Sequence, residues 1–344
     1  MKTSGSKISL ISPLTLAMWC GAACKYTLAL QAPYNTLPPE LSQLLDPGAE
    51  NGRDYEGARK IFREFPAERA QSLALMALGQ PQYSQRADTR RMLLEVIASH
   101  KGELIPEGRA RLMECLSDPA PVIQRMCCDS LSPEEIEREW QRLIAIVTSV
   151  SQSDMEREVA LNGIMGWGPC VKHHVDAFGN LFRNINEQER LRSFAARGVL
   201  NAGGLEEALR QFKDTDSVGA KVASTALAGY IAENDSYGRH LTVEDAKQRP
   251  AAIEFVLKAL KSPSVETRKE AFTDLGYVAG YDFIIFRSAT DYDLNPAIRK
   301  TLEEMAASDA DPELREWATA RLDPERMEKV AQGIIRRRQR ESQR

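Results

Sequence analysis

The chain has few aromatic residues and no convincing run that alternates between apolar and polar residues. Phenylalanine, tryptophan and tyrosine together make up 7% of its 344 residues. Because β-strands favour aromatic and β-branched residues in alternation, this shortage argues against a sheet protein. Alanine, leucine, glutamate and arginine dominate instead. Their preference for helix predicts an all-α fold.

A basic excess is also absent. The formal net charge is −4 and the sequence pI is about 5.8. Nucleic-acid-binding proteins usually carry surplus cations that neutralise phosphates, so no nucleic-acid partner is expected. The one basic stretch, RRRQRESQR at 336–344, is interpreted as a disordered tail. Contact with anionic lipid or nucleic acid is the alternative for this tail.

The sequence motifs of several common enzyme classes are missing. There is no Gly-x-Ser-x-Gly, no phosphate-binding loop, no His-Glu-x-x-His and no dinucleotide-binding fingerprint. We therefore expect no catalytic residues and no cofactor. Beyond the first 23 residues, no apolar run approaches the length that crosses a membrane.

The N-terminus has the features of an export signal. The uncharged run ISLISPLTLAMWCGAA (8–23) follows two lysines and is closed by small residues, as in a secretory signal peptide. The tetrapeptide that ends at Cys24 resembles a bacterial lipoprotein box, with glycine where that family prefers leucine, and implies lipidation at Cys24. We predict a signal peptide at 1–23 and an exported protein of the periplasm or cell envelope, anchored to the membrane only if Cys24 is acylated. An N-terminus that is buried and not cleaved is the alternative.

The remaining chain divides into a linker and a helical body. Residues 24–53 are rich in proline and glycine and lack a sustained period, which predicts a linker. From 54 to about 335 the pattern is helical. For example, SPEE at 132–135 is a capping box with proline at the first helical position. It opens a helix with one apolar face, formed by Ile136, Trp140, Leu143, Ile144 and Val147.

A short unit recurs along this body. The segment DPELREWATARL (311–322) is its clearest copy, with an arginine three residues after the proline. The recurring polar position falls at Arg90, Gln124, Arg157, Arg192, Lys221, Arg268 and Arg315. The intervals are 34, 33, 35, 29, 47 and 47 residues. Repeats of this length are typical of solenoids, in which no single unit can bury its own apolar face.

These copies resemble HEAT repeats of the bacterial HEAT-like type, whose second helix carries Asp-Pro-x-Val-Arg and then alanines. The segments DPELR (311–315) and PAIR (296–299) match best, and the similarity covers 85–325. The resemblance implies a right-handed, armadillo-type α-solenoid of six or seven helical hairpins over 54–335. It also implies that the arginine column hydrogen-bonds between neighbouring units. A basic binding ladder is the alternative role for this column.

Two insertions lengthen the later repeats, at 230–250 and 281–295. Insertions in solenoids often emerge on the binding face. The aromatic residues in them are candidate partner-binding residues: Tyr237, Tyr281, Phe283, Phe286 and Tyr292. A packing flap over the final repeats is the alternative for those in the second insertion.

The cysteines and histidines give little indication of a disulfide or a metal site. Cys127 and Cys128 fall in columns of small residues, which predicts buried packing. A disulfide from Cys115 to Cys127 is disfavoured, because a turn near Pro119 offsets the two residues by roughly 6 Å along the helices. The cluster CVKHH (170–174) supplies at most half of a zinc site, which needs three or four ligands, so no metal is expected.

The sequence thus predicts a non-enzymatic interaction scaffold that binds a protein or peptide partner through a solenoid surface. An intracellular HEAT-like enzyme or a nucleic-acid-binding protein is the alternative.

Overall fold

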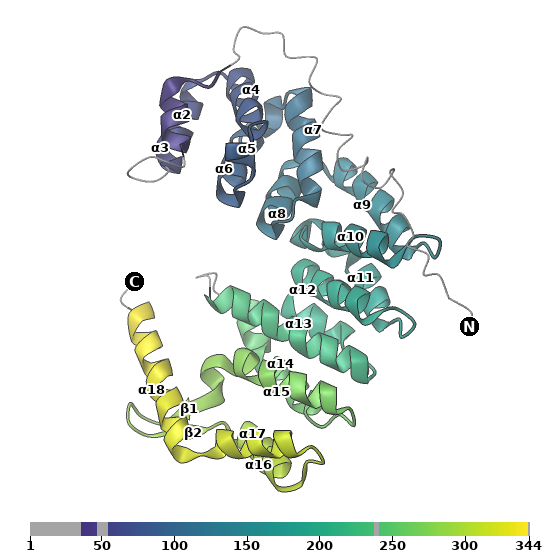
Figure 1. Cartoon of the computed structure of the whole chain (residues 1–344), viewed down its shortest axis with the longest axis vertical. Coiled ribbons are helices and arrows are strands. Elements are labelled where there is room, and N and C mark those ends of the chain that lie inside the picture. Colours follow the sequence, from purple (N-terminus) through teal and green to yellow (C-terminus); the bar gives the residue numbers. More distant parts are fainter. Residues whose placement is uncertain (1–35, 47–53, 237–240, 343–344) are drawn as a thin grey trace, which may run out of the picture. The chain divides into compact units, whose positions relative to one another are not determined.

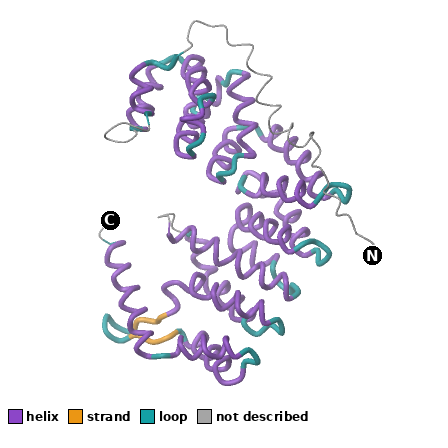
Figure 2. Tube along the Cα trace, viewed as in Figure 1, coloured by secondary structure: helices purple, strands orange, loops and turns teal. Residues whose placement is uncertain are grey.

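The structure is a computed structural model that describes residues 36–46, 54–236 and 241–342. Helices form most of these residues, so the predicted all-α class is confirmed (Figure 1). Within this part of the chain, the two short strands shown in orange in Figure 2 are the only sheet. The chain divides into two compact units, Met1–Val96 and Ile97–Arg344.

The described part of the first unit is a small helical body. Its helices are α2 (Pro39–Leu45), α3 (Tyr55–Glu64), α4 (Ala67–Leu78), α5 (Pro81–Ser84) and α6 (Ala87–Ala98), whose last residues belong to the second unit. Leu41 and Leu45 of α2 are fully buried. Helix α2 therefore lies inside the segment 24–53 that the sequence predicted to be a linker.

The second unit begins with helices that frame the site described below. They are α7 (Pro106–Glu114), α8 (Pro121–Ser130), α9 (Pro133–Thr148), α10 (Asp154–Met165), α11 (Val175–Arg183) and α12 (Glu189–Gln211). Three 3₁₀ helices lie beside them, η1 (Lys101–Glu103), η2 (Cys115–Ser117) and η3 (Gly168–His174).

The rest of the second unit contains α13 (Ser217–Ser236), α14 (Val243–Ala259), α15 (Val265–Ala279), α16 (Pro296–Ser308), α17 (Pro312–Leu322) and α18 (Pro324–Glu341). Between α15 and α16 lie η4 (Gly280–Phe283) and the strands β1 (Ile284–Phe286) and β2 (Tyr292–Leu294), which pair in antiparallel register.

Many helices that follow one another in the second unit pack together. Helix α9 packs on α10, α11 on α12, α14 on α15, and α16 on α17, and α13 also packs on α15, the next helix but one. Alanines such as Ala195, Ala196 and Ala223 are fully buried between them, and their small side chains allow the helices to approach closely. The capping box predicted at the start of α9 is confirmed, since Ser132 and Glu135 exchange both of its hydrogen bonds.

The arginine column is structural. Six of its seven members donate hydrogen bonds to the backbone of the preceding turn, whereas Lys221 pairs with Glu189. Arg268 Nη1 donates to the carbonyl of Ser262 at 2.9 Å, and Arg315 Nη1 donates to that of Asp309 at 2.6 Å. Four other members, Arg90, Gln124, Arg157 and Arg192, make equivalent bonds to Ser84, Asp118, Val147 and Phe182. Carbonyls left unpaired at the turns are thereby satisfied.

Three of these arginines also hold buried or partly buried carboxylates, and Arg157 does so with Glu187 at 2.6 Å. The guanidinium of Arg192, only 2% exposed, pairs with Asp216. Arg268 binds both oxygens of Asp309, at 2.8 and 2.9 Å, and both side chains are under 10% exposed. Guanidinium groups committed in this way cannot form the phosphate-binding ladder that was the alternative for this column.

Besides α2, the structure differs from the sequence predictions at three further segments. Most of the described part of 230–250 belongs to α13 and α14, where a loop was expected. Residues 281–295 contain the short hairpin, although no strand was predicted. Helix α18 continues to Glu341, so residues 336–341 are helical where a disordered tail was expected. In each case, contacts with other parts of the fold stabilise the segment beyond its local preference.

Several predictions fall on residues outside the described ranges. These are the signal peptide, the lipidation at Cys24 and the partner contact at Tyr237, so all three stay predictions. Among the described helices, none combines the length and the apolar character needed to cross a bilayer.

Candidate functional site

A pocket of 680 Å³ lies in the second unit where α8, α9 and η3 meet. Its apolar wall is formed by Leu131, Pro133 and Ile136. The polar residues on its lining are Cys128, Glu134, Glu137, Arg138, Cys170 and His173. The volume lies within the range of roughly 300–1,000 Å³ that is usual for small-molecule sites.

Three potential metal ligands converge at this pocket. Glu137 Oε2 lies 2.8 Å from His174 Nε2 and 3.2 Å from His173 Nε2. The ligand atoms of all three residues lie within 4.8 Å of one another. Glu137 comes from the second turn of α9, whereas the two histidines end η3. The fold therefore supplies the third ligand that the sequence analysis did not find for CVKHH.

Packing fixes one side of this cluster. The imidazole of His174 stacks on the indole of Trp140, with ring centroids 4.2 Å apart and planes within 4° of parallel. Trp140 is itself 2% exposed and lies one turn after Glu137 on α9. His173 is by contrast 61% exposed at its side chain and faces the open side. One imidazole is therefore rigidly placed, and the other is free to adjust.

The start of η3 also depends on a backbone conformation that suits glycine. Gly168 has a φ of +61°, in the left-handed region that residues with a side chain rarely occupy. Pro169 follows it, and Val171 interrupts the regular helical geometry with φ −111° and ψ 26°. This bend brings the chain round so that η3 ends against α9.

The carboxylate of Glu137 is held in its charged form. Hydrogen bonds from Gln141, from His174 and from His173 lower its pKa to about 2. The bond from Gln141 Nε2 is 2.7 Å long and reaches the oxygen that the histidines do not contact. Because the charged oxygen points at the imidazoles, the cluster can accept a cation without first losing a proton from Glu137.

The cysteines beside the cluster are thiols in hydrogen-bonded pairs. All four in the described chain are free, with Cys115, Cys127 and Cys128 buried and Cys170 half-buried, as the predicted packing requires. Cys128 pairs with Cys170, and this bond together with burial raises the pKa of the Cys128 thiol far above its usual value. Cys170 also donates to Asp129 Oδ1 at 3.2 Å. Cys128 is therefore a poor nucleophile.

The aromatic residues of 281–295 that were predicted to contact a partner lie far along the chain from this cluster, at the C-terminal end of the second unit. Phe283 is 6% exposed, and the guanidinium of Arg338 on α18 lies 4.7 Å from the ring of Tyr281. Phe286 and Tyr292 contact each other across the hairpin at 6.2 Å. Such contacts are expected of a flap that packs over the final repeats, which was the alternative role for the residues of 281–295. Binding of a partner by these residues stays a prediction.

The sequence alone did not predict the set of three metal ligands, for a specific reason. His173 and His174 were noted, but Glu137 precedes them by more than thirty residues on a different helix. Its neighbours in the sequence mark it only as a polar residue on an amphipathic helix. The stacking partner Trp140 was identified correctly as a core residue.

Comparison with known proteins finds similarity to solved structures only. No protein-family model and no curated protein matches the chain. Among solved structures, human deoxyhypusine hydroxylase in complex with glycerol matches over 82% of this chain and 93% of its own, with 16% sequence identity and a TM-score of 0.29.

Deoxyhypusine hydroxylase is an enzyme, in contrast to the non-enzymatic interaction scaffold that the sequence predicted, and that prediction is not retained. At this level of similarity, neither its activity nor its residues are transferred to this chain.

Proposed function

We propose that this chain is a metal-dependent enzyme whose centre is formed by Glu137, His173 and His174. The observation that carries the proposal is the convergence of these three ligand atoms from two separate segments at the mouth of a pocket. The proposal replaces the expectation that the chain has no metal and no cofactor.

The ligand set and its spacing fit a first-row transition metal or zinc. Metal bonds from imidazole and carboxylate are about 2.0–2.2 Å long, which separates neighbouring ligand atoms by about 3 Å. The separations of 2.8 and 3.2 Å from Glu137 to the imidazoles match that value. Two imidazoles with one carboxylate suit zinc or iron(II) better than calcium or magnesium, which prefer oxygen ligands.

Three protein ligands favour a reactive site over a structural one. Structural zinc sites are usually closed by four protein ligands, whereas catalytic sites leave a position for water or substrate. A metal bound here would supply Lewis-acid chemistry or activate a bound water. The protein would hold it rigidly through His174 on Trp140. A substrate would lie against Leu131 and Ile136, with Arg138 on the rim to contact an anionic group.

We further propose that the second unit is a right-handed HEAT-like α-solenoid. The paired helices and the recurrent hydrogen bond from the arginine column to the preceding turn support this arrangement. In this arrangement the pocket would form where one helical pair meets the next. An exported, envelope-located protein stays a separate prediction from the N-terminal sequence, and the metal-centre proposal does not depend on it.

Cobalt substitution tests the proposal. The full chain, stripped with a chelator and titrated with Co²⁺, should bind one ion and develop visible absorption bands. Azide should then shift these bands, because an open coordination position accepts it. Glu137→Gln and His174→Ala should each weaken Co²⁺ binding at least tenfold. Glu134→Gln, which changes an acid on the same pocket outside the cluster, should bind Co²⁺ as the wild type does.

Two outcomes would overturn parts of this proposal separately. If Glu137→Gln binds Co²⁺ as tightly as the wild type, the three residues do not form a metal site. If the metal binds at this site but azide leaves the spectrum unchanged, the site is closed, and the enzymatic reading of it is wrong.

A further inference from the structure

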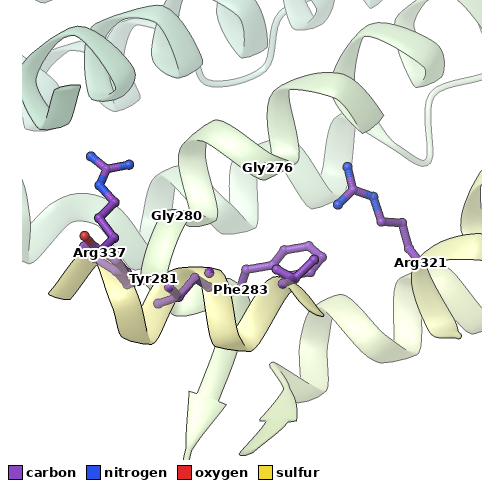
Figure 3. A pocket seen from close by; sticks show the side chains of 9 residues that line it. Gly276, Gly280, Tyr281, Phe283, Arg321 and Arg337 are labelled. Carbon is purple, nitrogen blue, oxygen red and sulfur yellow. The ribbon is translucent and has the colours of Figure 1, made fainter. Parts of the chain in front are cut away.

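A second pocket, of 280 Å³, lies at the C-terminal end of the second unit and shares no residue with the proposed metal centre. Its walls come from the end of α15, from η4, from the end of α17 and from α18. Figure 3 shows Phe283 between the side chains of Arg321 and Arg337. The volume suits a compact ligand, near the lower end of the usual range.

Two glycines leave this pocket open. Gly276 of α15 and Gly333 of α18 both line it, and a Cβ added to either would meet no atom within 4 Å. Neither has a positive φ, so no backbone requirement explains glycine at these positions. Glycine within a helix costs about 0.5–1 kcal/mol relative to alanine. The pocket therefore exists partly because two helices lack side chains where they border it.

The lining combines apolar surface with cations. Phe283, Val330 and Ile334 supply apolar surface, whereas Arg321 and Arg337 supply guanidinium groups, and no carboxylate lines the pocket. Arg321 stacks near the ring of Phe283, at 5.8 Å, and within the described chain it has no ion-pair partner. Burial and the nearby Arg326 lower its pKa, so its charge is only partly solvated and has no local compensation.

We propose that this pocket binds a small organic acid, with its carboxylate on Arg321 and its hydrocarbon body against Phe283 and Ile334. A guanidinium group offers paired donors that match a carboxylate, and desolvation strengthens such bonds. The apolar walls exclude inorganic phosphate as a good ligand, because phosphate would leave them uncovered and would lose its own hydration. The site is independent of the metal centre and does not rest on the proposed enzymatic function.

Ligand-observed NMR with the full chain tests this site, with phenylacetate as the probe. Phenylacetamide has the same shape without the charge, and inorganic phosphate has the charge without the apolar body. Phenylacetate should bind at least tenfold more tightly than either. Arg321→Met should weaken phenylacetate binding at least tenfold. Lys329→Met, which removes a cation from α18 outside the pocket, should leave binding unchanged.

A second test fills the pocket by replacing its glycines with a larger residue. Gly333→Leu places a side chain in the pocket from α18 and should block phenylacetate, and Gly276→Leu should do so from α15. Leucine favours helix more than glycine does, so both variants should keep the helical circular dichroism of the wild type. The proposal is overturned if phenylacetate does not bind, if phenylacetamide or phosphate binds equally well, or if both folded leucine variants still bind phenylacetate.

Discussion

The carboxylate of Glu137 lies 2.8 Å from Nε2 of His174, although 37 residues separate the two along the chain. Helix α9 presents the acid, and the bend of η3 presents the histidine. The contact is supported by Trp140, which carries the imidazole on its face. The proposed metal centre is based on this pair, which the fold brings together from two segments. His173 lies beside the pair as the third ligand, and the pocket lies in front of it.

Trp140 should affect both stability and metal binding. Trp140→Ala removes a buried indole and should lower the free energy of unfolding by about 3–5 kcal/mol, as other large-to-small core changes do. It should also weaken Co²⁺ binding, because His174 loses the ring that orients it. Urea titration and Co²⁺ titration measure the two effects. Trp317→Ala, in a half-buried tryptophan at the end of the unit, should lower stability alone. Equal Co²⁺ affinity in the two variants would argue against the positioning role.

Removing only one partner of the ion pair between Arg268 and Asp309 should strongly lower the free energy of unfolding. Arg268→Met leaves the carboxylate of Asp309 buried without its partner, which should destabilise the protein by about 3–5 kcal/mol. The matched change Lys261→Met, in an exposed pair with Glu304, should cost less than about 1 kcal/mol. Chemical denaturation of both variants measures the difference.

The same pair predicts a dependence on pH. Burial would raise the pKa of Asp309, but the hydrogen bonds from Arg268 and from the backbone N–H of Asp311, together with the charge of Arg268, outweigh burial, and the net pKa is lowered. A carboxyl group with a lowered pKa in the folded state stabilises the fold above its unfolded pKa. This contribution is lost as pH falls through the folded pKa. Arg268→Met should therefore lose less stability than the wild type on acidification below about pH 4, the usual range for aspartate. An unchanged acid dependence would contradict this account of the pair.

Asp274 should change the pH dependence of stability in the opposite direction to Asp309. Burial raises its pKa to about 6, in spite of hydrogen bonds from Ser224 and Thr225 that favour the charged form. Between about pH 4 and pH 6 the folded state holds the proton more tightly than the unfolded state does. Stability from this group therefore falls as pH rises through that window.

Replacement by asparagine isolates this effect. Asp274→Asn keeps an oxygen that accepts the bond from Ser224 but carries no charge. The variant should be more stable than the wild type by about 1–3 kcal/mol at pH 7 and nearly equal to it at pH 4. Urea denaturation at the two pH values gives the comparison. The same difference at both values would show that the charge of Asp274 is not involved.

Gly204 should not tolerate a side chain. It interrupts α12 with φ +76° and ψ −173°, and its neighbour Leu205 donates its N–H to Asp245 Oδ1 at 2.7 Å. Gly204→Ala should destabilise the fold by about 1–3 kcal/mol through backbone strain. Gly229→Ala, at a helical glycine with open space around it, should be neutral or stabilising. Thermal unfolding measures both. A similar effect in both variants would contradict the role of the positive φ.

The helical class and the caps could be predicted because they depend on local chemistry. Serine with glutamate three residues later satisfies the first free N–H groups of a helix wherever it occurs, and Ser132 does so at α9. The recurrent arginine column was visible for a related reason. Six of its seven members bond to a turn six or ten residues earlier, so their spacing from that turn is repeated in the sequence.

The features that the sequence did not predict, such as the ordered end of α18 and the metal ligands, depend on contacts between segments far apart in the sequence. RRRQR in α18 resembles a solvated tail when considered alone, yet Arg338 stacks on Tyr281 at 4.7 Å and on Phe286 at 4.9 Å. These contacts order the helix and cover the aromatic residues of 281–295. The metal ligands follow the same rule, because only the fold brings Glu137 to the histidines. The sequence shows the side chains without their partners, so it suggested an exposed binding surface.

X-ray absorption spectroscopy of the zinc-loaded full chain tests the metal centre most directly. The account predicts one zinc ion with two imidazole ligands at about 2.0–2.1 Å and a light-atom oxygen ligand, without sulfur. The imidazole scattering should fall in His174→Ala and remain in His100→Ala. A spectrum with sulfur ligands from the neighbouring cysteines, or one without imidazole scattering, would contradict the assignment of Glu137, His173 and His174.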